Sequence, residues 1–211
     1  MKKIIVFGAS GGTGKQVVTM ALQKGMKVTA IVRNPAVFNM ENPNLKVVKG
    51  DVLVPLTFRN ELEGQDAVIS CLGIPKIQET TLYSSGMRNI LQAMEQFTVK
   101  RIMCISSGAL DIPPGSSFIM KFLLKNVLQR LYKPIYSDMR LMENSLKNTE
   151  LDWTIVRAPK LSDGKYTGKY RDITRQPLKG IPKISRADLA AYLLGHLEDR
   201  SVMKKTVDVA Y

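Results

Sequence analysis

The sequence predicts a doubly wound α/β fold, in which a mainly parallel sheet is covered by helices on both faces. Short apolar runs rich in Val and Ile alternate with longer segments of helical periodicity. The runs lack the strict polar and apolar alternation of a sheet with one face in water. A chain of 211 residues, 45% hydrophobic and 23% charged, has the size and balance of one globular unit. We therefore expect a single domain over residues 1–211.

The apolar runs predict the strands, and the amphipathic segments between them predict the helices. Strands are expected over residues 4–7, 28–32, 46–48, 67–70, 101–105 and 153–156, with a late strand over 205–211. Helices are expected over 13–24, 80–96, 116–132, 137–148 and 185–199, and several begin at a Ser or Thr suited to the N-cap. Repeated strand, helix and strand units with right-handed crossovers build a parallel sheet. Loops rich in Pro and Gly around 111–116 and 159–182 should rim a cleft.

A glycine-rich turn, Gly8-Ala9-Ser10-Gly11-Gly12-Thr13-Gly14, joins the first expected strand to the first helix. This is the context that a Rossmann-type dinucleotide fingerprint requires. Gly8 permits the tight turn, Gly11 lets the backbone approach a pyrophosphate, and Gly14 lets the helix pack against the strand. The helix N-terminus supplies free N–H groups and a partial positive charge. We expect Ser10, Gly12 and Thr13 to contribute to the same cofactor site.

A P-loop is the competing interpretation of these glycines. Ala9 stands where the first P-loop glycine belongs, and Gln16 follows Lys15 where Ser or Thr should hold magnesium. The sequence therefore argues against nucleotide hydrolysis.

The end of the second strand indicates which dinucleotide is bound. NAD enzymes place an acid there on the adenosine ribose, whereas this chain has Arg33. The planar guanidinium can bind a 2′-phosphate, so we expect NADP(H) as the cofactor. An arginine on the solvated surface is the alternative interpretation.

The net charge of +13 attracts anions of any kind. Nine basic and only two acidic residues lie between residues 157 and 186, and we expect this stretch to be a loop region on the substrate side of the site. Lys160, Lys165 and Arg171 are candidate contacts to an anionic small-molecule substrate, and a solvated basic surface is the alternative. A reading helix, zinc-ligand spacing and an aromatic-studded basic strand are all missing, which disfavours nucleic acid as the partner.

The cysteines and the first residues bear on the location of the protein. Cys71 and Cys104 lie within apolar runs, which predicts buried thiols in a reducing compartment. They lack metal-ligand spacing, so we expect no metal site. We find no run of about 18 apolar residues and no room for a secretory signal before the glycine turn. We expect a cytoplasmic protein without a transmembrane segment, present as a monomer or a small homo-oligomer.

Several segments together resemble one known family, the atypical short-chain dehydrogenase/reductases with an NmrA-like, NAD(P)-binding fold. The similarity covers nearly the whole chain and rests on residues 8–14, Arg33, residues 50–52, residues 71–73, Ser106 and Ser107, the spacing of Tyr136 and Arg140, and residues 151–159. The resemblance implies adenine contacts from Asp51 and Val52. It also implies contacts to the adenosine side and the pyrophosphate from Leu72 and Gly73, contacts beside the nicotinamide from Ser106 and Ser107, and a backbone contact from Pro159.

The resemblance also suggests the chemistry. Many relatives carry Tyr-x-x-x-Lys on a helix, where positions i and i+4 share a face and the tyrosine protonates a carbonyl. This chain has Tyr136 and Arg140 at that spacing. Arginine keeps the positive charge that favours a tyrosinate, but it does not release a proton at ordinary pH. We take Ser107, Tyr136 and Arg140 as the candidate catalytic residues.

The branch of the family that contains biliverdin-IXβ and flavin reductases works without that tyrosine, with a serine beside the nicotinamide that Ser107 matches. A histidine follows the proline in that branch, whereas Lys160 follows Pro159 here. This difference makes a flavin, a quinone or a related carbonyl compound a better acceptor than a bilin. The resemblance therefore implies an NADPH-dependent reductase. The alternative is an NmrA-like regulator that senses NADP(H) without turnover.

The expected helix over residues 116–132 mixes apolar side chains with Lys121, Lys125 and Arg130. A helix of this composition suits a membrane surface. Packing on its own domain, or a flap over the substrate, is the interpretation that we favour from sequence.

Overall fold

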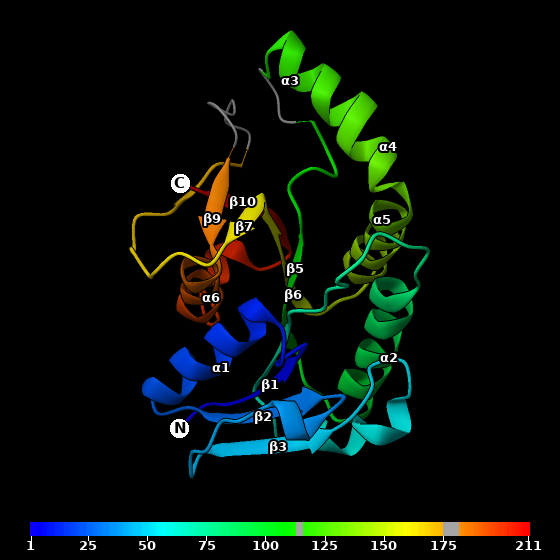
Figure 1. Cartoon of the computed structure of the whole chain (residues 1–211). Coiled ribbons are helices and arrows are strands. Elements are labelled where there is room, and N and C mark those ends of the chain that lie inside the picture. The colour runs from blue at the N-terminus through cyan, green and yellow to red at the C-terminus, as the bar shows by residue number, and fades with distance from the viewer. Residues whose placement is uncertain (113–115, 175–181) are drawn as a thin grey trace.

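An eight-stranded sheet forms the centre of the molecule (Figure 1), with the strand order β3-β2-β1-β4-β5-β6-β10-β8. The computed structural model describes residues 1–112, 116–174 and 182–211. Within these ranges every ladder of the large sheet is parallel except β10 with β8, which is antiparallel. Strands β7 and β9 form a separate parallel pair. The doubly wound, Rossmann-type α/β fold predicted from the sequence is confirmed.

The elements follow one another closely along the chain. The strands are β1 (Lys3–Phe7), β2 (Lys27–Val32), β3 (Leu45–Lys49), β4 (Ala67–Ser70), β5 (Arg101–Ser107), β6 (Asp152–Ala158), β7 (Lys160–Ser162), β8 (Arg171–Asp172), β9 (Lys183–Ser185) and β10 (Lys205–Ala210). The α-helices are α1 (Gly12–Gln23), α2 (Leu82–Gln96), α3 (Phe118–Phe122), α4 (Gln129–Leu131), α5 (Lys133–Lys147) and α6 (Arg186–Gly195). A π-helical segment, η4 (Leu123–Leu128), joins α3 to α4. Short 3₁₀ turns are η1 (Pro35–Val37), η2 (Pro55–Thr57), η3 (Arg59–Leu62) and η5 (Arg200–Val202).

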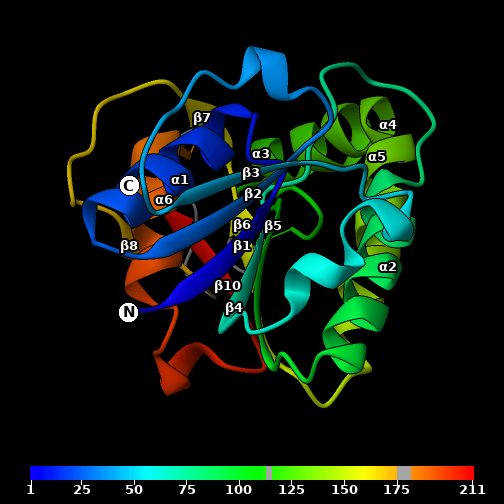
Figure 2. The same cartoon turned by 90° about the horizontal axis from the view of Figure 1, so that it is seen from below.

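The two faces of the sheet carry separate apolar cores. Figure 2 shows α1 and α6 on one face and α2 and α5 on the other. Along β1, Ile4 and Val6 belong to the core beneath α1 and α6, whereas Ile5 and Phe7 belong to the core beneath α2 and α5. All four side chains are fully buried. Burial on both faces explains why these strands are continuous apolar runs in the sequence.

Three features differ from the sequence-based expectation. The expected helix over 116–132 is α3, η4 and α4, and it runs almost directly into α5, which begins at Lys133. The expected loop region over 157–186 contains β7, β8 and β9. The third difference lies at the start of α2. The Thr80 hydroxyl, where the helix was expected to start, accepts from the N–H of Leu82 at 3.0 Å, and Thr81 makes no side-chain cap. The carboxylate of Asp138 on α5 accepts from the backbone N–H groups of Tyr83 and Ser84 at 2.8 and 3.3 Å.

Candidate functional site

A cleft lies at the carboxyl ends of β1, β2 and β4, where the strand order reverses. Its volume is about 570 Å³, within the range of about 300–1,000 Å³ for small-molecule sites. Ligands of open parallel sheets bind at such switch points, because the loops that leave neighbouring strands turn away from each other. Ten of the expected cofactor contacts line the cleft: Gly8, Ser10, Gly11, Gly12, Thr13, Arg33, Asp51, Val52, Leu72 and Gly73.

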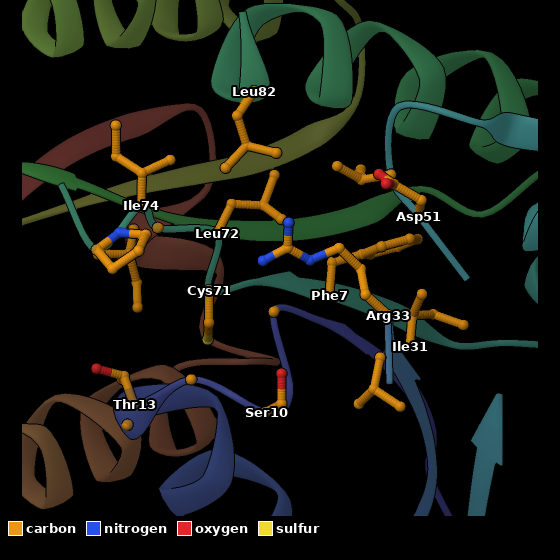
Figure 3. Close-up of a pocket in the computed structure, with 18 of the residues that line it drawn as sticks. Phe7, Ser10, Thr13, Ile31, Arg33, Asp51, Cys71, Leu72, Ile74 and Leu82 are labelled. Carbon is orange, nitrogen blue, oxygen red and sulfur yellow. The ribbon is translucent and has the colours of Figure 1, made fainter. Parts of the chain in front are cut away.

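The glycine turn forms one wall of this cleft, with Ser10 and Thr13 facing it (Figure 3). Gly8 has a φ of +71°, and a Cβ there would lie 2.4 Å from the carbonyl oxygen of Cys71. A Cβ on Gly14 would lie 2.1 Å from the carbonyl oxygen of Gly8, so only glycine lets α1 start this close to the turn. No side chain caps α1. The bare N-terminal turn of this helix therefore fits a pyrophosphate.

The opposite end of the cleft suits the adenosine half of a dinucleotide. Arg33 follows β2, and Figure 3 shows its guanidinium extending over the cleft between Asp51 and Leu72. Asp51 sits in a turn that its own carboxylate closes, by accepting from the backbone N–H of Leu53 at 2.9 Å. The side chain of Val52 is buried, and its methyl groups would lie 3.0 and 3.1 Å from a Cβ on Gly86. These contacts fix the loop after β3 beside Arg33.

Arg186 also lines the cleft, although in the sequence it stands out only as part of the basic stretch. It is the first residue of α6, and a Cβ on Gly12 would lie 2.7 Å from its Cδ and Nε atoms. Its guanidinium donates to the exposed carboxylate of Asp163 at 2.6 Å. Because a cation opposes the dipole at a helix N-terminus, an arginine directly after the capping Ser185 is the sequence signal that could have singled it out.

Three expected cofactor contacts lie outside this lining. Gly14 packs beneath the turn. The hydroxyl of Ser106 is buried and donates to Glu143 at 2.8 Å. Pro159 connects β6 to β7. Ile105 and Leu161 line the cleft instead and add apolar surface from β5 and β7.

Ser107 and Tyr136 come together where β5 ends. The Ser107 hydroxyl accepts from the N–H of Ala109 at 3.2 Å and lies close enough to the Tyr136 hydroxyl to lower its pKa. The Tyr136 ring stacks on Tyr132 with centroids 5.6 Å apart. Burial raises the pKa of Tyr136, and the hydrogen bond from Ser107 only partly offsets this. The phenol is therefore protonated at neutral pH, and it holds its proton more tightly than a free tyrosine does.

Arg140 lies one turn further along α5, but its guanidinium binds elsewhere. It donates to the carbonyl oxygen of Leu110 and, at 3.1 Å, to the carboxylate of Asp111. The pKa of Tyr136 thus shifts opposite to the direction expected from a neighbouring cation. In the structure Ser107 and Tyr136 lie together, whereas Arg140 binds the segment after β5.

A buried ionic network supports this end of the sheet. Glu143, 2% exposed, accepts from Arg157 Nε and Nη2 at 2.9 and 2.7 Å. It also accepts from Lys147 at 3.1 Å. Burial alone would raise the pKa of Glu143, but the hydrogen bonds and charge of Arg157 lower it. Arg157 reaches Asp111 as well, at 2.6 Å. The network ties α5 to β6 and to the residues after β5.

The candidate substrate contacts lie on the basic stretch. Lys160, Lys165 and Arg171 are exposed, and Lys160 is paired in register with Lys183 across β7 and β9. Figure 1 places these strands on the side of α6.

Asp188, a second residue that sequence analysis missed, anchors the loop between β7 and β8. Its buried carboxylate accepts from the N–H groups of Thr167 and Gly168, both at 2.9 Å, and from the hydroxyl groups of Ser185 and Tyr211 at 3.0 and 2.6 Å. Burial opposes ionisation, but these hydrogen bonds lower the pKa of Asp188 to about 2. The loop that bears Lys165 is thereby fixed to the start of α6.

Both cysteines are free and buried. Burial raises the pKa of Cys71 to about 12 and also raises that of Cys104. Among the described residues no cluster of His, Cys, Asp and Glu is arranged to hold a metal ion. None of the described helices is both long enough and apolar enough to cross a membrane.

Comparison with known proteins gives the family. A family model described as NAD(P)H-binding matches residues 8–200, and the chain belongs to this family. It is similar to the Bacillus subtilis protein YwnB, with 27% identity over 93% of this chain and 92% of YwnB. A protein of Bacteroides thetaiotaomicron named as an epimerase candidate is 29% identical, with a TM-score of 0.83 over 100% of this chain and 97% of that one.

The anaerobilin reductase ChuY of Escherichia coli O157:H7 has the same fold. The TM-score is 0.79 at 21% identity, over 99% of this chain and 96% of ChuY. The expected relationship to Rossmann-type NAD(P)-binding proteins is confirmed. The family match supports a nicotinamide cofactor, and the cleft is the candidate site for it.

Proposed function

We propose that the protein is an NADPH-dependent reductase that transfers hydride to a planar small-molecule acceptor, such as a flavin, a quinone or a related carbonyl compound. The observation that carries this proposal is the cleft itself, with a bare glycine cradle at one side and Arg33 at the adenosine end. The Tyr136 phenol, which lies beside Ser107, is the candidate proton donor at the end of β5. Bound NADPH supplies the hydride, and ChuY, which shares the fold, is named as a reductase.

Each part of the site has a separate task in this proposal. The backbone N–H groups at the start of α1 bind the pyrophosphate, and Arg186 adds a positive charge beside them. Arg33 binds the 2′-phosphate. Tyr136 gives its proton to the acceptor as the acceptor gains hydride, and Ser107 holds the phenol in place. Lys160, Lys165 and Arg171 attract an acceptor that carries negative charge.

Selectivity for NADPH over NADH tests the role of Arg33. We expect Arg33→Asp to weaken NADPH binding by about 10- to 100-fold, the value of a charge-assisted hydrogen bond. NADH binding should change little or improve. Arg200→Asp is the matched control, because Arg200 is an exposed arginine on η5 that does not line the cleft. Unchanged discrimination in Arg33→Asp would overturn the assignment of NADP(H).

A pyrophosphate contact from Arg186 makes a different prediction. Arg186→Met should weaken NADPH and NADH by a similar factor, since both cofactors carry the pyrophosphate. Their ratio should therefore stay that of the parent protein. A change in the ratio without a loss of NADH affinity would contradict this role.

Direct assay tests the reaction. Purified protein should oxidise NADPH in the presence of flavin mononucleotide, riboflavin or a panel of quinones. Tyr136→Phe keeps the stacking on Tyr132 and removes the proton donor, so kcat should fall about 100-fold for acceptors that need a proton. Cofactor affinity should stay the same. If no acceptor supports NADPH oxidation, the reductase proposal fails.

The binding of Arg140 to Leu110 and Asp111 favours one second candidate. Because Arg140 does not bind Tyr136, the proton relay of the related tyrosine enzymes is incomplete. A sensor of NADP(H) would not need that relay. A sensor would bind NADPH tightly without turnover and would retain or release a protein partner according to the redox state of the cofactor. In either role we propose a reducing, cytoplasmic environment, which suits the two free thiols.

A further inference from the structure

The segment formed by α3, η4 and α4 projects from the rest of the molecule (Figure 1). Most of its apolar side chains are exposed to water. A globular domain normally buries such residues or leaves them scattered singly. Here they gather on one short rod. The exposed fractions are 83% for Phe118, 79% for Ile119, 57% for Phe122, 37% for Leu123, 45% for Val127 and 55% for Leu131. Of the described side chains of this rod, only Leu124 is buried.

The charges on the same rod are all positive. Lys121, Lys125 and Arg130 are exposed, as is Lys133 at the start of α5, and residues 116–137 contain no Asp or Glu. The first acidic residue after this stretch is Asp138, whose carboxylate is buried at the start of α2. The rod therefore presents apolar and cationic groups with no local counter-charge from its own sequence.

This combination matches a helix that lies in the interface of a membrane, with apolar side chains among the lipids and Lys and Arg at the phosphates. A second copy of the chain is a poorer match, since two such rods would bring like charges together as their apolar faces met. A flap over the cofactor cleft would need these side chains to line the cleft, and none of them does.

We propose that α3, η4 and α4 form a docking surface for anionic lipid bilayers. Phe118, Ile119 and Phe122 insert among the headgroups, and Lys121 and Lys125 bind lipid phosphates. The rod follows β5 in the chain, so docking brings the membrane to the end of the sheet where Ser107 and Tyr136 lie. The surface is separate from the cofactor cleft, and the proposal holds whether or not the protein is a reductase.

Vesicle flotation of the full chain, without cofactor or acceptor, tests the proposal. Vesicles of phosphatidylcholine with about a third phosphatidylglycerol should bind the protein at least 10-fold more tightly than phosphatidylcholine alone, and added salt should weaken the binding. Phe118→Ser with Ile119→Ser, and separately Lys121→Gln with Lys125→Gln, should each reduce binding at least 10-fold.

Matched controls remove the same chemistry from other surfaces. Leu141→Ser changes an apolar residue on α5 that is 57% exposed, and Lys24→Gln with Lys100→Gln removes two exposed lysines elsewhere. Both should bind vesicles like the parent protein. NADPH titration should show that every variant keeps its cofactor affinity and hence its fold.

A Phe118→Trp variant provides a direct readout of insertion, because the single native tryptophan, Trp153, is only 7% exposed. Brominated anionic lipids should quench the added fluorescence. Three results would overturn the proposal: no vesicle binding by the parent protein, vesicle binding that the variants of α3 leave intact, or a dimer in light scattering that Phe118→Ser with Ile119→Ser abolishes.

Discussion

Replacing Glu143 by glutamine removes one charge from the buried network and keeps the shape of the side chain. In the parent protein the Arg157 side chain is 10% exposed and the Glu143 side chain 2% exposed. Glutamine leaves the buried guanidinium with Asp111 as its acidic partner, whose side chain is 55% exposed and screened by water. Breaking a buried pair by removing one partner costs about 3–5 kcal/mol.

A loss of this size is a large part of the total stability of a domain, about 5–15 kcal/mol. With a urea dependence of about 2 kcal/mol per molar, the midpoint of unfolding should fall by roughly 2 M. Trp153 lies on β6, the strand that carries Arg157, and its fluorescence reports unfolding together with circular dichroism. The two signals should move together if the transition stays two-state.

Two further variants serve as controls for this experiment. Glu150→Gln removes an ion pair with Lys204. Because the Glu150 side chain is 98% exposed, the urea midpoint of unfolding should stay unchanged. Glu143→Met combined with Arg157→Met removes both buried charges and should recover part of the loss. If Glu143→Gln lowers the midpoint no further than Glu150→Gln does, our account of the network is wrong.

Three more predictions follow from the packing and from the pKa shifts. Gly14→Ala should cost about 1–3 kcal/mol in urea unfolding and weaken NADPH at least 10-fold in calorimetry, because its Cβ would lie 2.1 Å from the Gly8 carbonyl oxygen. Folding lowers the pKa of Asp188 from 3.8 to about 2, so its ionised carboxylate contributes about 2 kcal/mol above pH ~4, and this contribution disappears as the pH falls toward 2. Asp188→Asn should therefore destabilise the protein at neutral pH. The difference in unfolding free energy between the variant and the parent protein should shrink as the pH falls. Because the pKa of Cys71 is raised to about 12 and that of Cys104 is raised as well, neither thiol should react with a disulfide reagent at pH 8 until urea unfolds the chain.

Each of these has a result that would count against it. Gly25→Ala is the matched control for Gly14→Ala. A Cβ at Gly25 would meet nothing within 4 Å, although its φ of +72° adds local strain. It should leave NADPH affinity unchanged, and equal losses in both variants would remove the steric argument. A constant stability difference for Asp188→Asn from pH 7 to pH 2 would contradict the linkage. Rapid labelling of a native thiol would show that the strands open more readily than their burial implies.

The fold could be predicted from the sequence because its signals are local. Apolar runs such as residues 4–7 indicate a strand with both faces covered. The glycine turn after them indicates that this strand passes directly into a helix. The cleft followed from the same reasoning, since the carboxyl ends of parallel strands meet at one edge of the sheet.

What escaped prediction depends on contacts between residues far apart in the chain. Thr80, which the sequence placed at the start of α2, accepts from the N–H of Leu82, whereas the N–H of Tyr83 binds Asp138, 55 residues further along the chain. Asp188 receives hydrogen bonds from Thr167 and Tyr211, on opposite sides of it in sequence. Arg140 has the right spacing from Tyr136, but spacing along a helix does not reveal which neighbouring carbonyl or carboxylate will compete for a guanidinium.

Helix α5 is held by contacts from three residues at alternate positions. Tyr136 lies against Ser107, Asp138 accepts hydrogen bonds from the start of α2, and Arg140 donates to the segment after β5. A substitution that rotates or slides this helix would disturb all three contacts at once. New acceptor specificity is therefore best sought, by selection in the laboratory or in nature, in β7 and the loop that follows it, where side chains can change without moving the cofactor.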